Sequence, residues 1–159
     1  MLIVSDTSCI TNLIQINQFN LLSAIYTTVI ISPVVKKELQ QFHLFSDEDI
    51  HKLNLVIQTP TNIAAVNELM LQLDAGESES IILAEELNAD FLLVDERKAT
   101  KIANERGLTT IGILGVILLA KQYAHIKMVK PLLDDLKANT TFRFTEKLYN
   151  LILSIANEK

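Results

Sequence analysis

Several residue types that mark common protein classes are scarce in this sequence. Its 159 residues include one cysteine, four glycines, three prolines and no tryptophan. A single cysteine excludes an internal disulfide framework, and so little glycine and proline argues against a linker or a low-complexity segment. No apolar run approaches the roughly 20 residues of a membrane span, and the apolar start lacks the basic region of a signal peptide. We therefore expect a cytoplasmic protein, with no membrane segment, that forms one domain over residues 1–159.

Positive charge is not in excess, because 14 basic residues face 19 acidic ones and the formal charge is −5. Bulk positive potential is therefore not a means by which this chain holds nucleic acid. The basic residues are unevenly placed, however. Four of them fall within residues 97–106, directly after Asp95, and two lysines directly precede Glu38. Positive charge thus flanks two acidic residues, although a basic helix surface is also commonly just solvated.

Short apolar segments that read as strands alternate with segments of helical periodicity. The expected strands cover residues 2–5, 27–31, 55–58, 90–94 and 109–111. Helices are expected between them, with Gly76 breaking the pattern between 62–73 and 78–87, and further helices at 126–137 and 145–155. Alternating strands and helices predict an α/β fold, in which a central parallel sheet of about four to five strands lies between helical layers. We expect about eight helices in this α/β/α sandwich.

Four carboxylates stand where strands or turns lead into helices. Asp6 follows the first strand, Asp95 follows the fourth, Glu38 lies behind Pro33, and Glu77 follows a glycine. Ligands of open parallel sheets bind outside the carboxyl ends of the strands, so these acids meet if the fold gathers them there. Clustered carboxylates repel one another unless a cation lies between them, and oxygen ligands suit Mg²⁺ or Mn²⁺. The alternative is that each acid is an ordinary helix cap or first-turn residue.

These motifs resemble the PIN-domain family over nearly the whole chain. The resemblance rests on Asp6-Thr7-Ser8 and on the segments 33–39, 76–80 and 94–97. Residues 87–95 and 107–115 are more similar to a branch of unassigned role than to toxin-type ribonucleases of the VapC kind. The family cuts RNA, less often DNA, with acids that hold one or two divalent metals. The resemblance therefore implies that Mg²⁺ or Mn²⁺ is held by the family's acidic set, which corresponds here to Asp6, Glu38, Glu77 and Asp95. Glu77 departs from the family, which more often has Asp there, and Glu79 and Glu96 are competing candidates.

Polar and basic residues beside the acids are candidates for substrate binding. The hydroxyls of Thr7 and Ser8 lie next to Asp6, and Asn12 is one helical turn beyond Ser8. Phosphate contacts are expected from the basic segment, through Arg97, Lys98 and Lys101. The toxin-type resemblance further implies a small antitoxin partner. The apolar C-terminal helix is a candidate homodimer surface, although simple core packing explains it equally well; its residues are Leu148, Leu151, Ile152 and Ile155.

Three functional classes follow from these observations. The leading hypothesis is a metal-dependent nuclease, most simply an endoribonuclease and in one version the toxin of a toxin–antitoxin pair. The alternative is a catalytically weak or inactive PIN-like module that binds nucleic acid or a protein. A phosphotransfer protein is disfavoured, because the phosphatase pattern requires a second acid where Ser8 stands. Cys9 is expected to be a core residue, and Gly112 to Gly115 a turn.

Overall fold

The computed structural model describes all 159 residues and contains one sheet of five strands. The strand order is β3-β2-β1-β4-β5, and every neighbouring pair is parallel. The predicted α/β class and the five strands are confirmed. Their bounds are β1 (Leu2–Ser5), β2 (Thr28–Ile31), β3 (Leu55–Ile57), β4 (Phe91–Leu93) and β5 (Thr110–Ile111).

Ten helices surround the sheet, where about eight were expected. They are α1 (Thr7–Gln15), α2 (Asn20–Ile25), α3 (Pro33–Gln41), α4 (Asp47–Lys52), α5 (Ile63–Leu69), α6 (Ala75–Glu86), α7 (Arg97–Glu105), α8 (Ile113–Gln122), α9 (Lys130–Asn139) and α10 (Glu146–Ile155). The prediction that Gly76 breaks the pattern was wrong, because Asp74 caps α6 and Gly76 lies inside its first turn. The expected helix over 126–137 begins only at Lys130, where a proline in the first turn favours a helix start.

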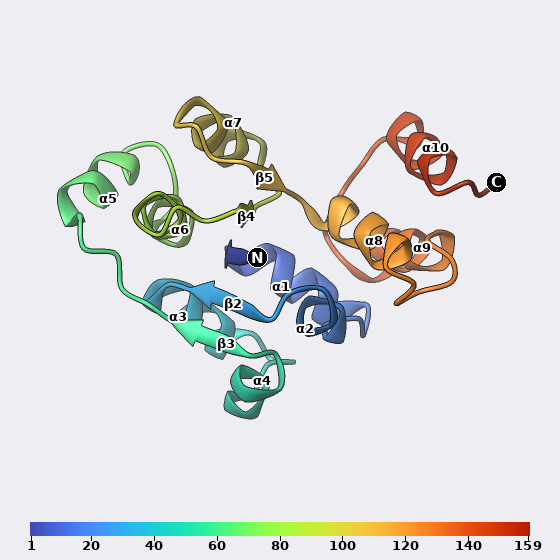
Figure 1. Ribbon diagram of the computed structural model, residues 1–159, viewed down its shortest axis with the longest axis horizontal. Helices are drawn as coiled ribbons and strands as arrows, with labels where there is room; N and C mark the ends of the chain where they lie inside the picture. Colours follow the sequence, from blue (N-terminus) through green and yellow to red (C-terminus); the bar gives the residue numbers. More distant parts are fainter.

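Alternate side chains of each strand point into two separate cores, which is why the strands are apolar throughout. Ile3 belongs to the larger core of 29 buried residues, with α1, α2 and α8 to α10, whereas Val4 belongs to a core of 13, with α5, α6 and α7. Figure 1 shows α5, α6 and α7 on one side of the sheet and α1, α2 and α8 to α10 on the other. The predicted α/β/α layering is therefore present.

Four of the ten helices end with asparagine, where glycine is the commonest residue. Asn17, Asn54, Asn88 and Asn157 have φ between 49° and 57° and follow α1, α4, α6 and α10. Asparagine is the residue that best replaces glycine in this left-handed conformation. Only Gly107, with φ of 85°, performs the same role as a glycine. Most of the scarce glycines are therefore free for other positions.

Helix α3 lies at the carboxyl edge of the sheet, where it packs against both α1 and α6. Its start matches the prediction, since Ser32 accepts a hydrogen bond from the N–H of Val35 at 3.1 Å and Pro33 is the first helical residue. Glu79 of α6 fixes the same end by accepting from the N–H of Val34 at 3.2 Å. This arrangement brings Glu38 to the edge at which β1 ends.

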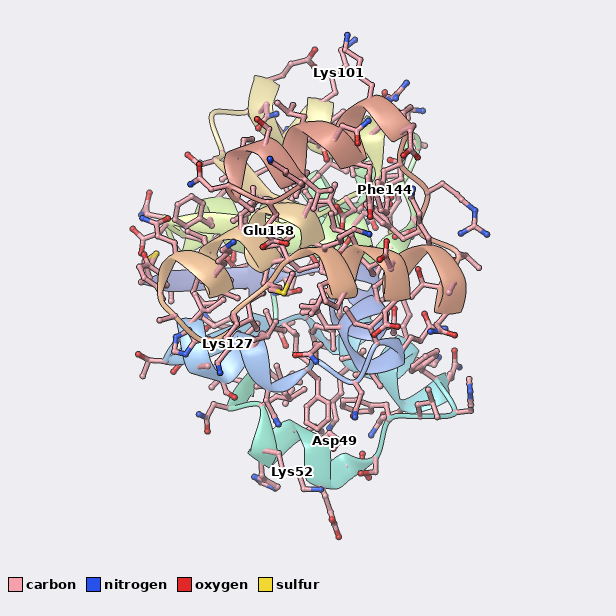
Figure 2. The ribbon with its side chains drawn as sticks, turned by 90° about the vertical axis from the view of Figure 1, so that its right-hand side faces the viewer. Asp49, Lys52, Lys101, Lys127, Phe144 and Glu158 are labelled. Atoms are coloured by element: carbon pink, nitrogen blue, oxygen red, sulfur yellow. The ribbon has the colours of Figure 1, made fainter.

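The C-terminal segment is fastened by Glu158, whose side chain lies among α8, α9 and α10 (Figure 2). It accepts hydrogen bonds from Lys121 Nζ at 2.6 Å and from the N–H groups of Val129 and Lys130 at 2.7 and 2.9 Å. Lys121 also donates to the carbonyl of Ala156 at 2.6 Å. Among all the helices, none has the length and apolar character needed to cross a membrane.

Candidate metal centre

Asp6 is the most buried carboxylate at the carboxyl edge, with 4% of its surface exposed. It caps α1 by accepting from the N–H of Cys9 at 3.3 Å, and it also accepts from the Ser8 hydroxyl at 3.2 Å. Burial raises the pKa of Asp6 to about 7, and the charges of Asp95 and Glu77 add to the increase against these two hydrogen bonds. Asp6 is therefore both the predicted cap and a member of an acidic group.

Glu38 contacts the residue that follows Asp6 in the sequence. The hydroxyl of Thr7 donates a hydrogen bond to the Glu38 carboxylate. The carboxylate also rests against Gly76 of α6. A Cβ atom at that position would lie 2.8 Å from one Glu38 oxygen and 3.0 Å from the other. A glycine at the start of α6 is therefore what allows the Glu38 carboxylate to occupy this place.

Asp95 follows β4 and is held at the start of α8. Both of its carboxylate oxygens accept from the N–H of Ile113 at 3.1 Å, and a Cβ atom on Gly112 would collide with one of them. The thiol of Cys9 donates to the same carboxylate with a sulfur to oxygen distance of 3.1 Å. Burial raises the pKa of Asp95, against the hydrogen bonds from the thiol and the N–H. Cys9 is thus a core residue, as predicted, but one that also touches an acid of the site.

Glu77 lies in the first turn of α6 and forms a capping box with Asp74. Asp74 accepts from the N–H of Glu77 at 2.8 Å, and Glu77 accepts from the N–H of Asp74 at 3.2 Å. Burial raises the pKa of Glu77, with further increases from the charges of Asp74, Glu96 and Glu38. Sequence reasoning missed Asp74 as part of the acidic group, although the Asp-x-x-Glu spacing of a capping box was visible.

Three of the predicted acids share one small polar hollow. It measures about 80 Å³ and is lined by Asp6, Thr7, Ser8, Glu38, Asp74 and Glu77. Asp95 does not line it and opens onto a neighbouring groove, which shares Ser8 with the hollow. No three acidic, histidine or cysteine side chains converge closely enough to enclose a metal ion by themselves. Each carboxylate instead accepts a hydrogen bond from the protein, as described above.

The donor set fits a hard divalent cation that keeps several water ligands. All candidate ligands are carboxylate oxygens, and Mg²⁺ characteristically binds through one or two carboxylates while retaining water. The hollow has room for water molecules, which need only about 10–15 Å³ each on this scale. The effects on the pKa of Asp6 are, from the largest, burial, the hydrogen bond from the N–H of Cys9, the charge of Asp95, the hydrogen bond from Ser8 and the charge of Glu77, with no basic side chain among them. A bound cation would therefore balance the charge of the Asp6 carboxylate, which no basic side chain of the protein balances.

Comparison with known proteins identifies the family. A sequence model described as a PIN domain matches residues 2–158. The chain belongs to the PIN-domain family. Among solved structures, a PilT N-terminus domain protein from the hyperthermophilic archaeon Sulfolobus solfataricus P2 is similar, with a TM-score of 0.51 and 20% sequence identity over 73% of this chain and 90% of that one. The structural similarity confirms the fold. No curated protein matches the sequence.

PIN domains are generally metal-dependent nucleases. Of the residues predicted to bind substrate in this PIN domain, Thr7 and Ser8 line the hollow, and Ser8 and Asn12 line the groove beside it. Glu79 and Glu96 are used as caps, on Val34 and on Ala99. Both stay alternative candidates, since Asp6 and Glu77 also take part in helix caps.

The predicted phosphate contacts on α7 lie outside both the hollow and the groove. Arg97, Lys98 and Lys101 are exposed, and the Lys101 amine lies 3.9 Å from Glu105. Figure 2 shows Lys101 extending from one end of the molecule into solvent. Phosphate binding by these three residues stays a prediction, and it requires a nucleic acid long enough to reach α7. Arg143, which sequence reasoning missed, is a basic residue that does line the groove.

The candidate homodimer helix divides its apolar residues between core and surface. Ile152 is buried, whereas Leu151 and Ile155 are about half exposed, at 52% and 56%. Core packing therefore accounts for only part of the apolar stripe of α10. Leu151 and Ile155 are accessible to a second copy of the chain, and the homodimer contact stays a prediction.

Proposed function

We propose that this protein is a divalent-metal-dependent endoribonuclease, formed by one PIN domain over residues 1–159, whose metal ligands are Asp6, Glu38, Glu77 and Asp95. The observation that supports the proposal is the gathering of Asp6, Glu38 and Glu77 around one polar hollow at the carboxyl edge of the sheet. Burial and like charge raise the pKa of Asp6 to about 7, which is the condition that a bound cation relieves.

The side chains around the acids hold them in place. Thr7 orients the Glu38 carboxylate, the N–H of Cys9 and the Ser8 hydroxyl orient Asp6, and the N–H of Ile113 orients Asp95. When bound, Mg²⁺ or Mn²⁺ activates water and neutralises charge on the phosphoryl oxygens. Asp6 and Asp95 are assigned as the principal ligands, and Glu38 and Glu77 complete the set directly or through water. The Thr7 and Ser8 hydroxyls line the hollow, and each donates its single proton to a carboxylate, so their role in the proposal is to orient Glu38 and Asp6.

A second candidate is an inactive PIN module that binds nucleic acid or a protein without cleaving. The observation that favours it is that no three potential ligands converge on one point. A toxin role with a small antitoxin partner is a narrower version of the first proposal, and it rests on the family resemblance alone.

Calorimetric titration of Mn²⁺ and Mg²⁺ distinguishes the two candidates. We expect saturable binding to the parent protein that is lost in Asp6→Asn and in Asp95→Asn, with Mn²⁺-dependent cleavage of a mixed RNA pool lost in the same variants. The matched control is Asp135→Asn, an exposed acid on α9 that forms no hydrogen bond or ion pair and should leave both properties unchanged. If the parent binds no metal up to millimolar concentration, the inactive module replaces the nuclease.

A further inference from the structure

A groove of about 470 Å³ adjoins the acidic hollow, and apart from Asp95 none of its lining residues is a proposed metal ligand. One wall is a face of α1 that carries Ser8, Asn12 and Gln15, at helical spacings of four and three. The groove is also lined by the linker between α9 and α10 and by two acids, Asp95 and Glu96. Ser8 lines both the groove and the hollow, so the two spaces are neighbours.

Asn12 is the residue that points to a ligand. It is 8% exposed, and its side-chain amide forms no hydrogen bond within the protein. Polar groups with so little exposure are almost always paired with protein, water or a ligand. The fully enclosed polar atoms without a partner are the Tyr26 and Ser80 hydroxyls, which lie outside the groove, whereas the Asn12 amide is still accessible from the groove that it lines. Asn12 therefore presents a free donor and a free acceptor to whatever enters, and it is more buried than Gln15, the other amide on the same wall.

The remaining lining is suited to a base and a phosphate. Phe42, at the end of α3, and Phe142, in the linker, are partly buried aromatic side chains on the walls. Arg143 is the basic residue of the groove, and its Nη1 donates to the carbonyls of Thr140 and Phe142 at 2.8 and 3.1 Å. These bonds fix the arginine, while its Nε and Nη2 groups form none within the protein. Aromatic faces stack on unpaired bases, and a guanidinium binds phosphate.

We infer that this groove binds one unpaired nucleotide of an RNA strand next to the bond that is cut, with the Asn12 amide on the edge of the base and Arg143 on a flanking phosphate. The inference rests on the proposed function and adds to it the residue that contacts the base. A base paired in a duplex has its pairing edge occupied and its faces stacked, so the groove selects unpaired nucleotides. An amide offers one donor and one acceptor side by side, which matches a base edge and not a phosphate.

Fluorescence anisotropy with two kinds of single-stranded oligonucleotide tests the inference. One kind carries bases and the other is abasic, with the same number of phosphates, and EDTA prevents metal-dependent cleavage. Asn12→Ala should weaken binding of the base-bearing oligonucleotides by roughly 5- to 100-fold and leave the abasic ones unchanged. Arg143→Gln should weaken both kinds alike and reduce the salt dependence by about one counterion. The difference between the two variants separates a base contact from a phosphate contact.

Further variants control for indirect effects. Asn20→Ala removes an exposed asparagine on α2, outside the groove, and should bind as the parent does. Asn12→Asp keeps the shape but loses the donor, so it should change the ranking of A, C and U oligonucleotides without unfolding the protein. The inference is overturned if the parent binds neither kind of oligonucleotide, if Asn12→Ala binds as the parent does, or if it weakens abasic and base-bearing oligonucleotides equally.

The groove and the nuclease proposal fail in distinguishable ways. Mn²⁺ binding and cleavage by the parent, together with unchanged base binding in Asn12→Ala, would discard the groove and keep the nuclease. Loss of base binding in Asn12→Ala, in a parent that binds no Mn²⁺, would discard the nuclease and keep the groove as the binding site of an inactive module. Asn12→Ala should itself retain Mn²⁺ binding, since Asn12 is not one of the carboxylates.

Discussion

The carboxylates of Glu158 and Asp6 both have little exposed surface, but their pKa values are shifted in opposite directions. The Glu158 side chain is 7% exposed and is surrounded by donors, including the Lys121 amine. Burial alone would raise the pKa of Glu158, but the hydrogen bonds from Lys121 and the two N–H groups lower it. Asp6 is 4% exposed, receives weaker hydrogen bonds and faces other acids, so its pKa rises to about 7.

The difference separates an acid that is paired within the protein from one that has no basic partner there. Glu158 is fully paired inside the protein and fastens the C-terminus to two helices. Asp6 stays unpaired by any cation of the protein, at the edge of the sheet where ligands of α/β proteins bind. A site whose charges are incompatible without an outside partner lowers the stability of the metal-free fold, a common feature of functional sites.

The largest expected effect on stability is that of breaking the paired acid. Glu158→Gln should lower the free energy of unfolding at pH 7 by about 2–3 kcal/mol, because it leaves the partly buried Lys121 amine without its charge partner. Chemical denaturation measures the change, with Asp135→Asn as the exposed control. Equal stability of Glu158→Gln and the parent would show that the C-terminal contact is no different from an ordinary surface ion pair.

The unpaired acid should respond with the opposite sign. In metal-free buffer at about pH 8, Asp6→Asn should raise the free energy of unfolding by about 1–2 kcal/mol, because a buried charge is replaced by a neutral group that still accepts from the N–H of Cys9. The same denaturation experiment checks this. A less stable Asp6→Asn protein would mean that Asp6 is chiefly a helix cap, and the contrast with Glu158 would disappear.

A pH series sharpens the contrast. The pKa of Asp6 is about 7 in the folded protein and has an ordinary value of 3.8, so between these values the folded protein retains a proton that the unfolded chain has lost. The contribution of Asp6 is therefore most favourable below about pH 4 and declines as pH rises through 7. Glu158 has a lowered pKa, so its stabilisation is present at neutral pH and is lost as pH falls into the acid range. Thermal melts should show both variants converging on the parent in acid and diverging in opposite directions at neutral pH.

The smallest expected effect comes from filling the space beside Glu38. Gly76→Ala should raise stability by up to about 1 kcal/mol, because alanine favours a helix, while its Cβ displaces the Glu38 carboxylate and weakens Mn²⁺ binding several-fold. Gly107→Ala is the matched control, since that glycine has a φ of 85° and open space around it. It should cost about 1 kcal/mol and leave Mn²⁺ binding unchanged. Tight Mn²⁺ binding by Gly76→Ala would remove Glu38 from the ligand set.

The sequence was sufficient for the order of elements and for the edge at which the acids gather. Short apolar strands and caps such as Ser32 with Pro33 are local signals, and Asp6 and Asp95 come within two residues of the ends of β1 and β4. Features that depend on contacts between distant segments were not predictable. The groove pairs Asn12 with Arg143, and no local pattern indicates that a linker after α9 reaches α1. Nor does periodicity reveal that the apolar residue Cys9 donates to Asp95.

Two of the four glycines leave room for acidic side chains and are not required by a left-handed backbone. Gly76 makes space for Glu38 and Gly112 for Asp95, and in both cases the atom that a larger residue would strike is the end of a movable side chain. A natural relative with alanine at either position would therefore fold normally and keep all four acids in its sequence, yet hold them differently. Under the proposed function, these two positions distinguish relatives in which the acids are all retained but are held differently.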